Sequence, residues 1–253
     1  MTVIYFETWH LPGEINMALD MELGRKSLEW EEPVLRIYSW EKPTLSIGRH
    51  QNIDDINLDF LRFMDIACVR RPTGGRAVLH WEEITYSIVF PKGCDEFNYN
   101  VLKLYREISK FFEKAFKNLG LDVEMSQGKG SLKNPACFSS SARYELLLKG
   151  RKFIGSAQLR TSEFVLQHGS ILLRLNEEIC SKTFRNSSRI GNLKSHATGI
   201  LEHKHVEVRE IVEAIKSSFD KKFSLKFLPY HKIIKLLRSS EKLRRRYFCL
   251  NST

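Results

Sequence analysis

The chain has 253 residues, of which 42% are hydrophobic and 28% charged, a composition typical of a globular protein. Its formal net charge of +10 serves either solubility or the binding of an acidic partner, which would be nucleic acid or an acidic protein, and charge alone does not distinguish them. No apolar run is long enough for a membrane span, and the first residues do not resemble a signal peptide. The five cysteines are odd in number and lack CxxC or zinc spacing, which favours a reduced, cytoplasmic compartment.

In the first half of the chain, the spacing of apolar residues predicts six elements in succession. They are a helix over 15–29, strands over 34–40 and 44–47, a short helix over 57–63, a strand over 67–71 that leads into a turn, and a strand over 84–90.

The second half begins with the clearest helix, 100–119, which Gly120 ends. The elements expected after it are a polar loop over 126–141, a β-hairpin with arms 144–148 and 152–158, a strand over 165–173, a helix over 208–219 and a basic amphipathic helix over 230–248. Because strands and helices do not alternate regularly, this order predicts an α+β fold with a mixed, mostly antiparallel sheet flanked by helices. We expect a catalytic domain over 1–225 and a basic helical appendage over 226–253.

A glycine pair in the segment 70–80 is the first candidate for ligand binding. Gly74 and Gly75 follow a strand, and adjacent glycines allow a ligand to approach the backbone and its N–H groups. Arg71 is suited to a phosphate or a carbonyl, and His80 ends the segment. A plain glycine turn with solvated arginines is the alternative. The segment does not match a P-loop.

Cys137 is the candidate nucleophile because small polar residues surround it in a predicted loop. Cys68 and Cys180 flank apolar runs, as packing residues do, whereas Cys94 and Cys249 belong to a loop and the tail. The alternative for Cys137 is the ordinary role of a small buried hydrophobic residue.

The second hairpin arm and the following strand supply further candidates. Lys152 lies near Gly155, Ser156 and Gln158, and these small neighbours leave room for a ligand over the strand. His168 and Gly169 enter the next apolar strand. A solvated lysine and a hydrogen-bonded structural histidine are the alternatives. The histidines lack metal-ligand spacing, so we expect no metal.

Together these segments resemble the lipoate–protein ligase and octanoyltransferase family over residues 5–220. The stretches 16–20 (NMALD) and 43–48 (PTLSIG) match the start of that family, and 85–87, 150–160 and 167–173 follow in its order. The resemblance implies the fold shared with biotin ligases and class II tRNA synthetases, in which a mixed sheet holds the acyl chain in an apolar tunnel.

The family contains ATP-dependent ligases and cysteine-dependent transferases, and three features favour the transferases. Arg76 stands where ligases tend to have a third glycine, and 143–145 (RYE) replaces their Asn-Asp pair. The segment 136–138 (ACF), followed by 150–158, resembles the branch that loads the glycine cleavage H protein. That branch implies octanoyl-acyl carrier protein as donor, a lipoyl domain or H protein as acceptor, and no cofactor, nucleic acid or membrane. An ATP-dependent lipoate–protein ligase is the nearest alternative, and a basic nucleic-acid-binding protein a remote one.

The resemblance also implies a mechanism. Cys137 is expected to carry the acyl group, and the ammonium of Lys152 is expected to favour its thiolate. Backbone N–H groups of Gly74, Gly75 or Cys137 are expected to stabilise the oxyanion. The other pocket residues expected are Arg71, His80, Gly155, Ser156, Gln158, His168 and Gly169. In the predicted hairpin Lys152 pairs with Leu147, so the loop 134–143 must fold back over the sheet for Cys137 to reach it.

Overall fold

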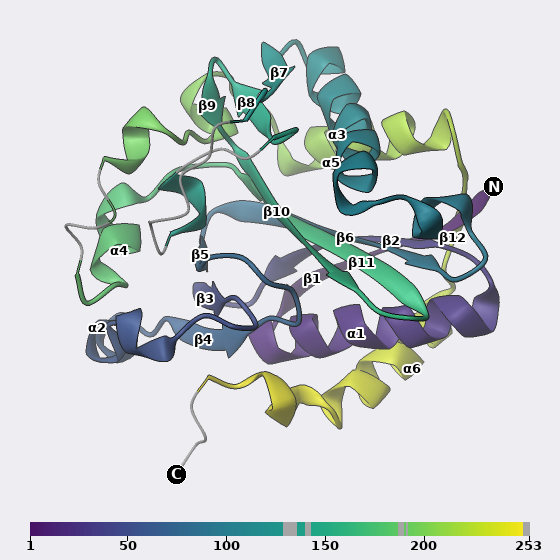
Figure 1. Cartoon of the computed structure of the whole chain (residues 1–253), viewed down its shortest axis with the longest axis horizontal. Helices are drawn as coiled ribbons and strands as arrows, with labels where there is room; N and C mark the ends of the chain where they lie inside the picture. Colours follow the sequence, from purple (N-terminus) through teal and green to yellow (C-terminus); the bar gives the residue numbers. More distant parts are fainter. Residues whose placement is uncertain (129–135, 140–142, 187–189, 191, 250–253) are drawn as a thin grey trace.

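The protein, described here by a computed structural model covering residues 1–128, 136–139, 143–186, 190 and 192–249, is organised around a six-stranded sheet (Figure 1). Its strand order is β10-β11-β6-β2-β1-β12. The strands are β1 (Thr2–Leu11), β2 (Val34–Trp40), β6 (Glu83–Pro91), β10 (Ile154–Arg160), β11 (Phe164–Leu172) and β12 (Ser224–Phe227). The pairs that join β2, β6, β11 and β10 are antiparallel, whereas β1 lies parallel to both β2 and β12. The predicted mixed, mainly antiparallel sheet is therefore confirmed.

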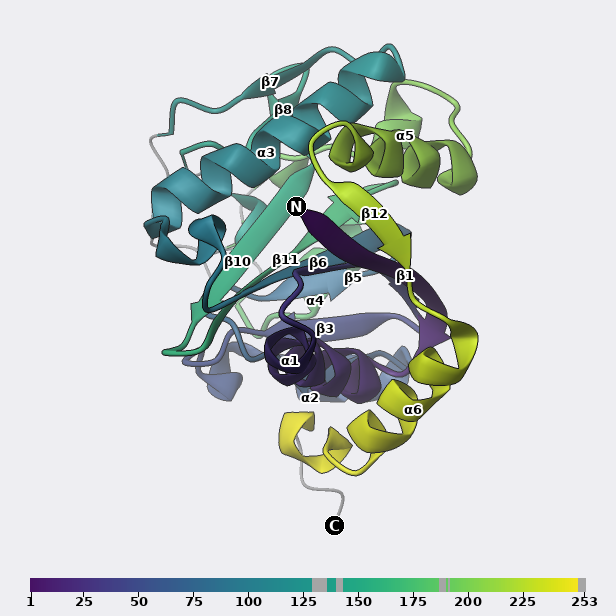
Figure 2. The ribbon, with the colours of Figure 1, turned by 90° about the vertical axis from the view of Figure 1, so that its right-hand side faces the viewer.

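Helices cover both faces of this sheet. In Figures 1 and 2, α3 (Val101–Asn118) and α5 (Val208–Asp220) lie on one face, and α1 (Gly13–Trp30) and α6 (Tyr230–Glu241) lie on the other. Side chains alternate along a strand, so β1 contributes to both cores. Val3 packs in the core under α3 and α5, and Ile4 packs in the core with α1 and α6. The flanking helices predicted from apolar spacing are thus confirmed.

Two small sheets border the large one. The first has the order β4-β3-β5 and contains β3 (Thr44–Ile47), β4 (Ala67–Arg70) and β5 (Val78–His80). The second has the order β7-β8-β9 and contains β7 (Val123–Met125), β8 (Leu146–Leu148) and β9 (Arg151–Lys152). Short helices complete the fold: α2 (Leu58–Phe63), α4 (Glu177–Lys182) and the 3-10 turns η1 (Ile53–Asp55), η2 (Asp95–Asn98), η3 (Cys137–Ser139), η5 (Leu193–Ser195), η6 (Ile200–Glu202) and η7 (Arg244–Tyr247).

The predicted hairpin forms only at its turn. Lys152 lies opposite Leu147, as expected, but the strand breaks at Phe153 and β10 joins the large sheet beside β11. The reason is the side chain of Phe153, which is fully buried and meets the ring of Phe116 edge-on at 5.0 Å. The prediction of one hairpin arm over 152–158 is therefore wrong, because the core draws the chain from one sheet into the other.

The C-terminal segment also differs from the prediction of a single helix over 230–248. The helix α6 ends at Glu241 and the turn η7 follows. Phe248 then forms an isolated antiparallel bridge with Val69 of β4, and the N–H of Cys249 donates to the carbonyl of Cys68 at 3.3 Å. This pairing requires extended backbone, which a continuing helix cannot provide. The expected domain boundary at 225 falls inside β12, and the separate appendage stays a prediction.

Of the predicted loop over 126–141, residues 129–135, 140 and 141 lie outside the described residues, and these include Asn134 and Pro135. Residues 126–128 have no regular structure, and Cys137 begins η3. Across the described part of the chain, none of the helices combines the length and apolar character that crossing a membrane requires.

Candidate active site

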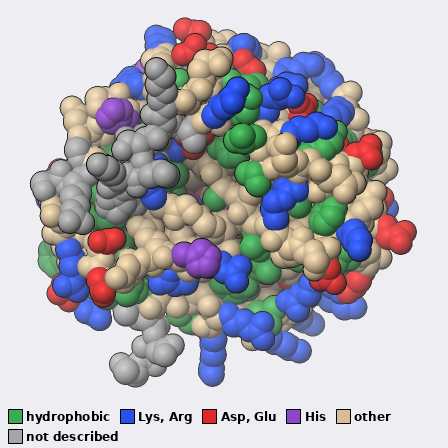
Figure 3. All heavy atoms as spheres, in the orientation of Figure 1, with side chains coloured by type: hydrophobic (Ala, Val, Ile, Leu, Met, Phe, Trp, Pro, Cys, Tyr) green, Lys and Arg blue, Asp and Glu red, His purple; other side chains and the backbone are tan. Residues whose placement is uncertain are grey.

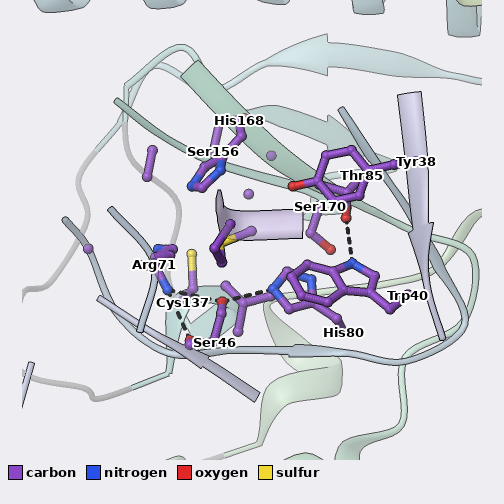
Figure 4. Close-up of a pocket in the computed structure, with 16 residues that line it drawn as sticks. Tyr38, Trp40, Ser46, Arg71, His80, Thr85, Cys137, Ser156, His168 and Ser170 are labelled. Atoms are coloured by element: carbon purple, nitrogen blue, oxygen red, sulfur yellow. Dashed lines mark hydrogen bonds between the residues drawn. The ribbon is translucent and has the colours of Figure 1, made fainter. Parts of the chain in front are cut away.

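A pocket lies where the large sheet and the β4-β3-β5 sheet meet the N-terminal half of α1. Figure 4 shows Cys137 and Arg71 on one side of it, with Trp40 and Thr85 on the other. The lining residues are Met17, Tyr38, Trp40, Ser46, Arg71, Gly75, Val78, His80, Thr85, Cys137, Gly155, Ser156, Ala157, His168, Gly169 and Ser170. Most of the residues predicted for the pocket thus line it. Gly74 and Gln158 do not, and Lys152 lies beside the pocket instead.

The short turn η3 carries Cys137 into this pocket. Ala136 bridges to Ala77, just before β5, and the N–H of Cys137 donates to the carbonyl of Ala77 at 2.9 Å. These contacts fold the cysteine segment back over the sheet, as the mechanism requires. They also engage the peptide N–H of Cys137 itself, so in this conformation an N–H that stabilises an oxyanion near Cys137 would come from another residue.

Lys152 and Cys137 lie side by side. The Nζ of Lys152 is 3.5 Å from the Sγ of Cys137 and 3.1 Å from its carbonyl oxygen. A third contact joins Nζ to Oε1 of Glu145 at 2.7 Å, and both charged side chains are buried. Burial alone would lower the pKa of Lys152, but the negative charges of Cys137 and Glu145 offset this and raise it. The lysine is therefore an ammonium at neutral pH, directed at the sulfur.

A second thiol lies behind the first. Cys180 of α4 and Cys137 both line a smaller cavity below the main pocket. Burial raises the pKa of the Cys180 thiol to about 12, and the nearby charge of Cys137 adds to that effect. Cys180 is therefore protonated at neutral pH and is a poor nucleophile, in agreement with the packing role predicted for it.

The Arg71 side chain forms all its hydrogen bonds with the glycine loop and with Ser46. Its guanidinium has five N–H donors. These donate to five acceptors, namely Thr73 Oγ1, the carbonyl and hydroxyl of Ser46, and the carbonyls of Gly74 and Arg76. Burial lowers the pKa of Arg71 to about 10, although the charge of Cys137 opposes the change. In this conformation the Arg71 side chain shapes the loop, and the expectation that it binds a phosphate or a carbonyl of a ligand stays a prediction.

A chain of buried hydrogen bonds supports Thr73, which accepts a hydrogen bond from Arg71. Thr73 Oγ1 lies 2.7 Å from Nε2 of His168, whose Nδ1 lies 2.9 Å from Oδ2 of Asp20. Burial and the charge of Arg71 lower the pKa of His168, although Asp20 acts in the opposite direction. The ring is therefore neutral at neutral pH, so Nδ1–H donates to Asp20 and Nε2 accepts from Thr73. His168 thus lines the pocket and also supports the loop, as the structural alternative for it expected.

Asp20 also anchors the centre of the molecule. It forms a fully buried ion pair with Arg36, with Nη1 and Oδ1 3.0 Å apart. Burial opposes ionisation of Asp20, but the hydrogen bond with His168 and the charge of Arg36 outweigh it and lower the pKa of Asp20. Asn16, one helical turn before Asp20, accepts a further hydrogen bond from Arg36 through its side-chain oxygen. The matched stretch 16–20 therefore holds β2 and β11 to α1.

His80 closes the other end of the pocket. Its ring stacks on the indole of Trp40 with ring centres 3.9 Å apart, and its Nε2 lies 2.8 Å from Oγ of Ser46. The indole N–H donates to Oγ1 of Thr85 at 2.9 Å and to Glu83 at 2.8 Å. Residues of four strands, β2, β3, β5 and β6, therefore fix this wall, which leaves the aromatic face of Trp40 and the side chains of Met17 and Val78 as its apolar surface.

Ser156, Gly155 and Gly169 form the floor. The hydroxyls of Ser156 and Tyr86 lie 2.7 Å apart, and Gln167 donates to the Tyr86 oxygen at 2.7 Å. A Cβ at position 169 would come within 2.4 Å of Ser156 Oγ, so glycine is required there. Gln158 lies beyond this network and donates to Gln167 at 2.7 Å and to the carbonyl of Val101.

Sequence reasoning missed three parts of the site. Glu145 was noted only because it departs from the ligase pattern, although an acidic residue within seven positions of a lysine on a hairpin is a usable signal. Asp20 and Thr73 belong to matched segments, but neither was given a role. Their connection runs through His168, which is 148 residues from Asp20 in the sequence, so no local pattern indicates it.

The chain also resembles known proteins. Residues 12–220 match the model of the lipoyl protein ligase A/B catalytic domain. Two relatives named octanoyltransferase LipM, from Bacillus subtilis and Halalkalibacterium halodurans, are 38% and 37% identical over 248 residues. Each alignment covers 88% of this chain, and 89% and 90% of the respective relative.

Two solved structures share the fold. One is lipoate-protein ligase A bound with ATP, with a TM-score of 0.75, 20% identity, and coverage of 95% of this chain and 94% of that one. The other is a putative lipoate protein ligase from T. acidophilum with bound lipoic acid, with a TM-score of 0.72, 20% identity, and coverage of 96% and 95%. The resemblance inferred from the sequence is confirmed, and the chain belongs to the lipoyl protein ligase A/B catalytic domain family.

Proposed function

We propose that this protein is an octanoyltransferase of lipoate biosynthesis that carries the acyl group as a thioester on Cys137. Its donor is octanoyl-acyl carrier protein, and its acceptor is a lysine of a lipoyl domain or of the glycine cleavage H protein. The names of the relatives support octanoyl transfer. The observation that carries the mechanism is the pairing of the Cys137 sulfur with the buried Lys152 ammonium at the wall of a partly apolar pocket.

The first half-reaction loads the enzyme. The Cys137 thiolate attacks the carbonyl carbon of the donor thioester, and the oxygen becomes an oxyanion beside the Lys152 ammonium. The bond from carbon to the donor sulfur then breaks, and the departing thiolate takes a proton from solvent. A thioester replaces a thioester, so this step needs no ATP.

The second half-reaction transfers the octanoyl group from the enzyme to the acceptor. A neutral lysine amine of the acceptor attacks the carbonyl carbon of the Cys137 thioester, and a C–N bond forms. The bond from carbon to Sγ breaks, and the proton released by the nitrogen balances the charge that returns to the sulfur. Gly74 and Gly75 remain candidates for donating backbone N–H groups to the oxyanion in both steps. The products are an octanoyl amide and the free enzyme.

The arrangement of Arg71 supports transfer over ATP-dependent ligation. Its five donors already bind the glycine loop and Ser46, so none remains for a phosphate unless the loop rearranges. Arg76, which occupies the position where ligases tend to have a third glycine, also has its carbonyl bound by Arg71.

Intact-protein mass spectrometry tests the proposal. Purified enzyme mixed with octanoyl-acyl carrier protein, without ATP or magnesium, should gain the mass of one octanoyl group. Cys137→Ser should gain none, whereas Cys180→Ser, a matched change at the neighbouring thiol, should still be loaded. Addition of a lipoyl domain or H protein should move the mass to the acceptor. Activity that requires free octanoate or lipoate together with ATP would instead identify a ligase.

A further inference from the structure

The acidic residue behind Lys152 is held in place by the backbone. Tyr144 adopts a left-handed conformation with φ of 68°, and its N–H donates to the carbonyl of Ser126 at 2.9 Å. The N–H of Ser126 donates back to the carbonyl of Glu145 at 2.8 Å. A non-glycine residue in this conformation is uncommon and needs support from its surroundings. The turn directs Glu145 inward, where its side chain is buried against Lys152.

Two negative groups flank the single ammonium of Lys152. Its Nζ lies between the sulfur of Cys137 and Oε1 of Glu145, and the ring of Phe138 lies 5.2 Å away. Arg76 of the glycine loop is the cation that opposes the charge of Lys152. Only one of the two negative groups reacts during catalysis, so the counter-charge of the lysine changes during the cycle.

The change occurs when Cys137 is acylated, since a thioester sulfur has no charge. A buried ammonium without a counter-ion is costly and tends to lose its proton. Among the described residues, Glu145 is then the negative side chain that still contacts Nζ. We propose that Glu145 is a positioning residue that holds Lys152 as an ammonium beside the thioester carbonyl, so that the oxyanion of the second half-reaction forms next to a positive charge.

This inference rests on the proposed acyl transfer, and it assigns the lysine a fixed charge. Lys152 then donates hydrogen bonds in both half-reactions and does not accept the proton of the attacking amine. That proton instead balances the charge on the regenerated sulfur of Cys137. Among the described residues, the hydroxyls of Tyr86 in β6 and Tyr105 in α3 also interact with Glu145. Burial raises the pKa of Tyr86 to about 12 and that of Tyr105 well above its ordinary value, so both are neutral in the range where the lysine matters.

The decisive experiment measures the second half-reaction alone. Octanoyl-enzyme is isolated and mixed with hydroxylamine, a nucleophile that stays neutral from neutral to alkaline pH, and its loss is followed by mass spectrometry. Glu145→Gln keeps the size of the side chain but removes its charge. The alkaline pH at which the rate falls should move down by about one pH unit or more in this variant. Glu124→Gln, the same change at an exposed position in β7 opposite Leu147, should match the wild type.

A second readout does not depend on acyl transfer. Cys137 is capped as a neutral methyl disulfide, and the Lys152 side chain is titrated by NMR. The midpoint should be lower in Glu145→Gln than in the wild type, and Glu145→Asp, which restores the charge, should recover most of the difference. Equal midpoints in the wild type and Glu145→Gln would overturn the inference. Failure of Cys137 to accept an octanoyl group would instead overturn the proposed function, and the titration would still decide the role of Glu145.

Discussion

The Nζ of Lys152 in β9 lies 3.5 Å from the Sγ of Cys137 in the turn η3. The distance is long for a hydrogen bond between an ammonium and an oxygen, but sulfur is larger, and such contacts tighten when substrate binds. This relationship makes Cys137 distinct from Cys180, whose thiol pKa is raised by burial.

Lys152→Ala should shift the alkylation of Cys137 to higher pH, because the thiolate loses the ammonium that stabilises it. Iodoacetamide labelling followed by peptide mass spectrometry measures the shift at each pH. Lys117→Ala removes a lysine on the exposed face of α3 and is the matched control. Identical labelling profiles for Lys152→Ala and the wild type would refute the role given to the lysine.

Gly155→Ala should slow acyl-enzyme formation by about tenfold or more, because a misplacement of well under 1 Å affects a reacting pair. A Cβ at this position would lie 3.2 Å from the sulfur of Cys137 and 3.3 Å from Cε of Lys152, closer than most such contacts. Stopped-flow or quenched mass spectrometry measures the rate, and far-UV circular dichroism checks that the fold is retained. A folded variant with the wild-type rate would show that the site accommodates the added methyl group without displacing Cys137 or Lys152.

Asp20→Asn should lower the free energy of unfolding by about 3–5 kcal/mol, because it leaves Arg36 charged and buried without a counter-ion. Urea unfolding at neutral pH measures the loss. The matched control is Asp59→Asn, whose side chain is 93% exposed in its pair with Arg62 and should contribute little.

The same residue predicts a dependence of stability on pH. The pKa of Asp20 is lower in the folded protein than in the unfolded chain, so its contribution is complete above the ordinary pKa of aspartate. It is lost as the pH falls through the lower, folded value. The difference in unfolding free energy between wild type and Asp20→Asn should therefore shrink in acid. A difference that stays constant would contradict this account of the ion pair.

The C-terminal helix offers a surface for acidic partners. Lys and Arg side chains gather along the lower edge of the face drawn in Figure 3, where α6 and η7 lie in Figure 1. The residues concerned are Lys232, Lys235, Arg238, Arg244, Arg245 and Arg246, and all except the half-buried Arg244 are exposed. Electrostatic recruitment weakens with salt, so kcat/KM for the carrier-protein donor should fall as ionic strength rises.

Replacing the exposed cations of this surface with Gln should reduce both kcat/KM and its salt dependence, with little effect on hydroxylamine release from preloaded enzyme. Equal neutralisation of the five exposed cations of α3, which are Lys103, Arg106, Lys110, Lys114 and Lys117, provides the comparison. If the rate of loading were the same at low and high salt, the helix would serve only solubility and packing.

The sequence was sufficient to predict most of the fold, because the central elements have strong periodicity. The helix α3 carries an apolar stripe, and β6 is an unbroken β-prone run buried on both faces. It did not predict β1, β5, β7, β12 or α4, and two further errors depend on distant contacts. The break at Phe153 follows from contact with Phe116, and the end of α6 follows from the bridge between Phe248 and Val69.

The reacting residues of the site were predictable from the sequence, but the contacts that bring them together were not. Cys137 and Lys152 were named from small neighbouring residues and from the family resemblance, and the structure brings them together. Their approach depends on the bond from Cys137 to Ala77, which joins residues 60 positions apart. The hydrogen bonds of Arg71 to the loop were not predicted, because a sequence shows that an arginine is near glycines but not which acceptors its donors reach.

Three different sheets determine the surroundings of Cys137. One positions its backbone, another provides the neighbouring ammonium, and the third leaves space for its sulfur. Ala77 leads into β5, Lys152 belongs to β9, and Gly155 belongs to β10. Local opening of any of the three separates these parts while leaving the thiol itself intact. The pairing of the sulfur with the ammonium is therefore a property of the completed fold. In a nascent or partly unfolded chain, Cys137 has neither the ammonium beside its sulfur nor the space beside Gly155.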